Sequence, residues 1–156
     1  GRGRGRNMSW ILQVLNNKFL INSLIAWAIA QGAKALLHAF LARRFDWSRL
    51  VGSGGMPSSH SATVTALAAT CARLRGLGSF EFGFAVILAL IVMHDAMGVR
   101  LETGKQARIL NQFIEFASAM GRDISPEEKL KELVGHTPAQ VLAGGLIGLA
   151  VGLLLS

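Results

Sequence analysis

Hydrophobic residues along this chain gather in long blocks, whereas soluble domains usually show short amphipathic periods. The blocks cover residues 19–41, 61–72, 80–97 and 137–155. A helix needs about 20 residues to cross the core of a bilayer, and the last two blocks approach that length. The second block reaches it only if its helix begins back at Pro57. We predict an all-α integral membrane bundle of about four transmembrane helices; the alternative is a soluble helical bundle with unusually apolar cores.

Polar residues between the blocks indicate where helices begin. Thr137 followed by Pro138 is typical of an N-cap with proline at the first helical position. Ser125 and Glu128 have the spacing of a capping box and predict a short helix running toward Val134. Residues 105–120 place six apolar side chains on one helical face: Ile109, Leu110, Phe113, Ile114, Ala117 and Met120. We expect this amphipathic helix to lie along the membrane surface.

Composition narrows the classes of function. The chain combines 51% hydrophobic residues with a net charge of +7. It has no basic stretch interleaved with aromatic residues and no zinc spacing, so we expect no nucleic-acid partner. The single cysteine, Cys71, permits no internal disulfide. We interpret residues 1–8 as an artificial leader before a native start near Met8, and residues 9–156 as one membrane-embedded domain.

The charges predict an orientation. With four spans, the connections 43–58 and 98–136 lie on one side of the membrane. That side holds nine cations: Arg43, Arg44, Arg49, Arg100, Lys105, Arg108, Arg122, Lys129 and Lys131. The other side, apart from the leader, holds three: Lys18, Arg73 and Arg75. The positive-inside rule therefore predicts that the first side is cytoplasmic.

The same threading brings three polar motifs to one membrane face. They are the stretch SGGMPSSH at residues 53–60, the stretch from Asp95 to Lys105, and Gly135-His136-Thr137-Pro138. Two of them begin helices, and helix N-termini attract anions. Each of these two carries a histidine, His60 or His136. Together with nearby Arg100 and Lys105, they predict a phosphate site.

Phosphoryl transfer is the chemistry that suits such a site, because it depends mainly on positioning and charge stabilisation. A neutral histidine attacks phosphorus, and a second, protonated histidine donates a proton to the leaving alkoxide. A covalent phosphohistidine divides the displacement into two easier steps.

The segments GGMPSSHSA, HDAMGVRLETGKQA and LKELVGHTPAQVLAGG resemble the divergent bacterial and plastid branch of the type 2 phosphatidic acid phosphatase superfamily. This superfamily is related to acid phosphatases and vanadium haloperoxidases. The resemblance covers nearly all of residues 20–155 and makes the domain phosphatase-like. It implies that His60, in the Pro-Ser-Gly-His position of residues 57–60, is the acid. It implies that His136 is the nucleophile.

The chain also departs from the superfamily pattern. Lys129 and Leu130 stand where Ser-Arg is expected, and Gln140 stands where an aspartate normally orients the nucleophile. The first motif, Lys-x6-Arg-Pro, is absent, since Lys34 and Arg43 are nine residues apart.

Other residues must then supply these roles. Our candidates are Arg100 and Lys105 for the phosphate clamp and Asp95 for the orienter. We expect further substrate contacts from five residues: Ser58, Ser59, Gly135, Thr137 and Lys34.

Several of these assignments have structural alternatives. His60 would serve as a helix cap, and Asp95 would serve as the ion-pair partner of Arg100. Lys34 and His38 share a helix face and either point at the site or extend to the lipid headgroups.

We hypothesise a membrane phosphatase that acts on a phosphatidylglycerophosphate-, phosphatidate- or prenyl-phosphate-like lipid. The alternative is a non-catalytic phospholipid-binding or scaffold protein that retains the anion pocket. We expect no cofactor and no metal, although Asp95, Glu102 and Glu115 offer carboxylates to Mg²⁺. Expected partners are the substrate lipid, membrane lipids and a second copy, packed through Gly144, Gly145 and Gly148. The expected location is a bacterial plasma membrane or a plastid membrane.

Overall fold

The computed structural model describes residues 10–43, 55–122, 130, 132 and 134–156, and these contain helices and no strands. A short helical segment at residues 10–15 precedes the main elements. These are α2 (Lys18–Ala42), α3 (Ser59–Arg75), α4 (Phe80–Met97), α5 (Val99–Ala119) and α6 (Pro138–Leu154). The all-α prediction is confirmed over this part of the chain. The expected leader and the capping box at Ser125 lie outside the described residues.

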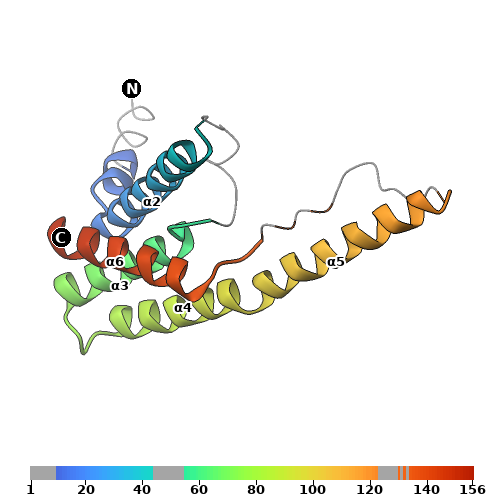
Figure 1. The fold of residues 1–156 in the computed structure, drawn as a ribbon. Coiled ribbons are helices and arrows are strands. Elements are labelled where there is room, and N and C mark those ends of the chain that lie inside the picture. The colour runs from blue at the N-terminus through green and yellow to red at the C-terminus, as the bar shows by residue number, and fades with distance from the viewer. Residues whose placement is uncertain (1–9, 44–54, 123–129, 131, 133) are drawn as a thin grey trace, which may run out of the picture.

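Helix α3 forms the centre of the bundle, in contact with α2, α4 and α6 (Figure 1). Its core contacts are made by small side chains. Ala26 and Ala30 of α2 and Ala62 and Ala66 of α3 are fully buried and cluster with Val151 of α6. Because alanine extends so little from the backbone, these helices approach closely, as is common where helices pack within a membrane.

Three glycines bring α6 still closer to α3. Gly144, Gly148 and Gly152 recur every four residues and therefore share one face of α6. A Cβ atom added at Gly144 or Gly148 would collide with the backbone of Ser58 or Ala62, respectively. This glycine face is thus occupied within the chain. The expectation that Gly144 and Gly148 form a seam with a second copy is wrong, because α3 already covers them.

The helix starts follow the capping chemistry of the sequence. Thr137 caps α6 in a capping box with Gln140, and Pro138 is the first helical residue, as predicted. Ser58 caps α3 by accepting a hydrogen bond from the backbone N–H of Ser61. Ser58 and Thr137 lie at the same end of the bundle. The N-termini of α3 and α6 are therefore next to each other.

Two helical segments are long and apolar enough to cross a membrane. They are Lys18–Ala42, with 25 residues, and the α4–α5 pair Phe80–Ala119, with 40. Helix α6 is apolar but shorter, and α3, also of 17 residues, is about 25 Å long at 1.5 Å per residue. Of the four expected spans, two therefore meet this test. Large apolar side chains are exposed on the outer surface of α2 and α4, among them Trp27, Phe40 and Phe84.

Helix α5 continues the direction of α4 past Gly98 and projects beyond the bundle (Figure 1). Its outer part is amphipathic, as predicted, with Ile109, Phe113 and Met120 exposed. It begins at Val99, six residues earlier than expected. Leu130 and Glu132 contact α5 again, and His136 follows them at the end of the bundle where α4 ends.

Candidate functional site

The three polar motifs meet at one end of the bundle, as predicted. This holds for the residues of each motif that the structure describes. The backbone N–H of Ser58, at the start of α3, donates to the carbonyl of Gln140 in α6 over 3.0 Å. The backbone N–H of His136 donates to the carbonyl of Ala96, near the end of α4, over 2.9 Å. Two helix N-termini and one helix C-terminus are thus joined by hydrogen bonds around a single location.

His60 and His136 lie next to each other at this location. Their ring centroids are 5.8 Å apart and their planes are tilted by 58°. His60 belongs to the first turn of α3 and is half-buried, whereas His136 precedes the cap of α6 and is only 2% exposed. The pairing of the two histidines predicted from the sequence is therefore present in the fold.

Gln140 orients His136. Its side-chain Oε1 accepts the backbone N–H of Thr137 at 3.0 Å and lies 3.4 Å from His136 Nδ1. Because a carbonyl oxygen only accepts, His136 donates from Nδ1, and the lone pair of the neutral ring is then on Nε2. From the sequence, Gln140 is a departure at the aspartate position, and the orienter was expected to be Asp95. The location of Gln140 in the first turn of α6, four residues after His136, was the signal for this contact.

Burial lowers the pKa of His136 below its ordinary value of 6.5, and the nearby charges of His60 and Lys34 act in the same direction. Hydrogen bonds to Gln140 and to the backbone of Gly55 oppose this shift. The net direction is downward, so the neutral imidazole is favoured near pH 7.

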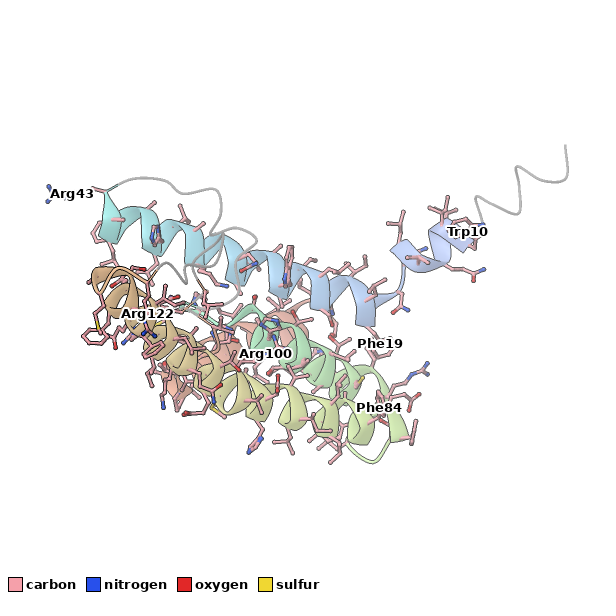
Figure 2. All side chains as sticks on the ribbon, turned by 90° about the vertical axis from the view of Figure 1, so that its right-hand side faces the viewer. Trp10, Phe19, Arg43, Phe84, Arg100 and Arg122 are labelled. Atoms are coloured by element: carbon pink, nitrogen blue, oxygen red, sulfur yellow. The ribbon has the colours of Figure 1, made fainter. Side chains whose placement is uncertain are left out.

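Arg100 connects His60 to Asp95. Its Nη1 lies 3.5 Å from His60 Nε2, and its Nε donates to Asp95 Oδ2 over 2.6 Å (Figure 2 labels Arg100). Of the two roles left open for Asp95, the structure supports the ion-pair partner. Asp95 holds the guanidinium beside His60, and the contact with His136 Nδ1 that an orienter would make belongs to Gln140.

Lys34 lies at the site as well. It is 4% exposed, its charge reaches both imidazoles, and its Cγ and Cδ lie against Gly55. Of the two orientations considered for Lys34, the structure has the one toward the site. A buried ammonium beside two histidines makes this end of the bundle strongly attractive to an anion.

The remaining predicted residues shape the backbone around the histidines. Ser58 is fully buried, and its hydroxyl is used in the cap of α3, where it also accepts from the hydroxyl of Ser61. Ser59 is buried too. Gly135 has a φ of +85°, and a Cβ there would collide with the backbone of Arg100 and Leu101, so only glycine fits this crossing.

Lys105 lies on another side of Gln140. It lines a cavity of about 340 Å³ together with Gly55, Thr137 and Gln140. Its Nζ donates to Glu102 Oε1 over 2.6 Å at an exposed position. Of the two cations expected to form the phosphate clamp, Arg100 therefore lies next to a histidine, whereas Lys105 lines the cavity beside Gln140.

Two side chains of α5, Asn111 and Arg108, bind the segment that leads to His136. The side chain of Asn111 accepts the backbone N–H of Leu130 at 3.1 Å and donates to its carbonyl at 2.9 Å. Asn111 and Arg108 both donate to the carboxylate of Glu132. Leu130 occupies the place of a superfamily arginine, and it takes part in these contacts through its backbone N–H and carbonyl. Lys129, the other departure at that motif, lies outside the described residues.

Within the part of the chain that the structure describes, no three His, Cys, Asp or Glu side chains gather as metal ligands. Asp95 and Glu102, considered for Mg²⁺ from the sequence, are paired with Arg100 and Lys105.

Comparisons with known proteins agree with the resemblance seen in the sequence. A family profile described as "Divergent PAP2 family" matches residues 15–151. A Bacillus subtilis (strain 168) protein named "Uncharacterized membrane protein YuiD" is 39% identical over 156 residues, covering 93% of this chain and 98% of the relative. No solved structure matches the chain.

Proposed function

Since the chain belongs to the divergent PAP2 family, a branch of the type 2 phosphatidic acid phosphatases, we propose that it is an integral membrane phosphatase acting on a lipid phosphate. The observation that carries the proposal is the pairing of His60 and His136, whose ring centroids are 5.8 Å apart, with Arg100 beside His60. Two imidazoles this close together can contact the same phosphoryl group.

In the proposed reaction, His136 Nε2 attacks phosphorus and the bond between phosphorus and the lipid oxygen breaks. The protonated ring of His60 donates its proton to the departing oxygen. Water then attacks the phosphohistidine and gives a proton to His60, which releases inorganic phosphate and restores both rings. Arg100 and Lys34 stabilise the charge on the phosphoryl oxygens. The reaction as written needs no metal ion.

The lipid substrate follows from where the site lies. Two segments meet the length and composition for crossing a membrane, and the site lies within the second of them, where its apolar part, α4, ends and α5 begins. We propose that α3 and α6 also cross, shielded by their neighbours, which gives the four-span topology. A lipid then presents its phosphate to the site without leaving the bilayer. Substrates of the phosphatidylglycerophosphate, phosphatidate or prenyl phosphate type fit this arrangement.

The test is phosphate release from these lipids by protein purified in detergent, with and without EDTA. We expect His60→Ala and His136→Ala to lower the rate at least about 100-fold, the usual contribution of a general acid or a nucleophile. Arg73→Ala, an exposed substitution in the last turn of α3, far from its N-terminus at the site, is the control and should retain activity. Equal rates in all four proteins would reject this mechanism. Lipid binding without turnover across the panel would favour the non-catalytic alternative.

A further inference from the structure

An apolar groove lies between α4 and α6 on the outer side of the bundle. Its walls are Leu90, Met93 and Met97 of α4 and Leu142, Gly145 and Leu149 of α6. Thr65 of α3 also lines it. Its volume is about 1010 Å³, at the upper end of the roughly 300–1000 Å³ common for ligand sites. It is open along its length, and apart from one end its lining is almost entirely apolar.

That polar end borders the histidine site. Asp95 and Pro138 line the groove there. Asp95 binds the arginine that lies beside His60, and Pro138 follows His136 by two residues. From this end the groove runs along α6 toward the opposite end of the bundle. A molecule whose phosphate contacts the two imidazoles therefore has the mouth of the groove next to it.

The length of the groove matches one leaflet of a bilayer. Pro138 and Leu149 are eleven residues apart, which corresponds to about 16 Å along a helix. Half of a hydrocarbon core about 30 Å thick is about 15 Å. Methionine side chains at Met93 and Met97 are flexible and adapt to chains of different shape.

We propose that this groove binds one hydrocarbon chain of the substrate lipid while its phosphate lies between His60 and His136. The proposal rests on the proposed function and extends it, because it makes a long chain a requirement for efficient turnover. A phosphate ester without such a chain would fill only the polar end of the site.

Gly145 provides a way to fill the groove without disturbing the helix contacts. Unlike Gly144 and Gly148, which press against the backbone of α3, Gly145 has room for a side chain. A Cβ added there would lie 3.7 Å from Thr65 Oγ1, an ordinary contact. Gly145→Leu should therefore fold and place its branched end in the groove. Gly83→Leu is the matched control, since Gly83 lies on the exposed surface of α4 with nothing within 4 Å.

The first experiment compares kcat/KM for dioleoyl phosphatidate with that for a water-soluble, short-chain phosphatidate. In Gly145→Leu we expect the value for the long-chain lipid to fall at least about tenfold, as when two or more methylene groups lose apolar contact. The value for the short-chain lipid should stay within about twofold of that of the unmodified protein, and Gly83→Leu should change neither value. An equal change for both substrates, or no change for the long one, would overturn the proposal.

The second experiment does not depend on turnover. A phosphatidate carrying a photoreactive group midway along one chain is added sparsely to vesicles, with an equally labelled diacylglycerol as reference. We expect phosphatidate-specific labelling of residues 90–97 and 138–149, reduced about fivefold or more by Gly145→Leu. Labelling spread evenly over all lipid-facing helices would overturn the proposal. If the protein hydrolyses no lipid phosphate, the proposed function fails, and this labelling alone then decides whether the groove binds the chain.

Discussion

Gln140 is neutral where the superfamily motif has an aspartate, and this changes the proton chemistry of His136. A carboxylate at that position would favour the imidazolium form, whereas an amide oxygen accepts the Nδ1 proton without adding a charge. With Lys34 and Arg100 already close by, a neutral orienter leaves the positive charge of the site for the phosphate. The substitution is therefore compatible with a working nucleophile.

The isosteric change Gln140→Glu tests this. The folded-state pKa of His136 lies below 6.5, so its neutral form is present above that lowered value and is lost as the pH falls through it. The new carboxylate should raise this pKa, because it favours the charged ring. We expect the acidic limb of the profile of kcat/KM against pH to move to higher pH, and the NMR titration of the His136 ring to move with it. An unchanged titration would show that Gln140 does not contact His136.

The histidines could be predicted from the sequence, but the contact of His60 with Arg100 could not. His60 and His136 each stand in a short motif that includes its own helix cap, so local chemistry identifies them. Asp95 was a reasonable orienter because it ends an apolar span near Arg100, where a carboxylate needs a partner. The contact of Gln140 with His136 is local to the first turn of α6, whereas the contact of Arg100 with His60 joins residues 40 positions apart and depends on packing across the bundle.

Among the helices, α5 holds the described residues that precede His136, namely Leu130, Glu132 and Val134. Asn111 bonds to both backbone groups of Leu130, as a neighbouring strand would, and Arg108 and Asn111 bind Glu132. A Cβ at Gly104 would collide with the backbone of Glu132 and Val134. These contacts fix the approach of the chain to His136.

Asn111→Ala should loosen this support. Losing the two part-buried hydrogen bonds to the backbone of Leu130 costs about 1–3 kcal/mol in total, and we expect the unfolding free energy to fall by that amount. Hydrogen exchange at the amides of Leu130 and His136 should become faster, and the rate of phosphate release should fall. Gln112→Ala, an exposed change one residue further along α5, is the control. Unaltered exchange in Asn111→Ala would mean that the hydrogen bonds of Asn111 do not hold Leu130 and His136 in place.

Helix starts were easier to predict than the role of α5. The caps at Ser58 and Thr137 are local and are present in the structure. The amphipathic pattern of residues 105–120 correctly predicted a helix, but it showed only that one face is apolar. That the polar face holds a segment about 20 residues later in the chain is a tertiary contact with no periodic signal.

For the whole molecule, the orientation in the membrane follows from the distribution of charge. Arg43 and Arg122 lie at one end of the molecule, and Phe19 and Phe84 lie toward the other (Figure 2). The cations counted on the site's side of the membrane outnumber those on the opposite side. We propose that this side faces the cytoplasm, so that the substrate belongs to the inner leaflet.

Cysteine accessibility tests this orientation. In a Cys71→Ala background, Ser118→Cys on the exposed side of α5 should resist a membrane-impermeant thiol reagent in intact cells and react after permeabilisation. Gly78→Cys, in the turn between α3 and α4, should react in intact cells, since a Cβ there meets nothing within 4 Å. The reverse pattern would place the site on the outer face and imply outer-leaflet substrates.

The glycine face of α6 has a consequence for how the two histidines move. His60 and His136 lie at the starts of two helices that touch backbone to backbone through Gly144 and Gly148. No side chain of α6 stands between these helices at Gly144 and Gly148, so at these two positions their spacing is set by backbone contact and not by a side-chain rotamer. The imidazole rings of His60 and His136 are therefore carried by one closely packed helix pair, α3 and α6. Any larger residue at Gly144 or Gly148 would push α6 away from α3. It would thereby increase the distance between the two imidazole rings without contacting either of them.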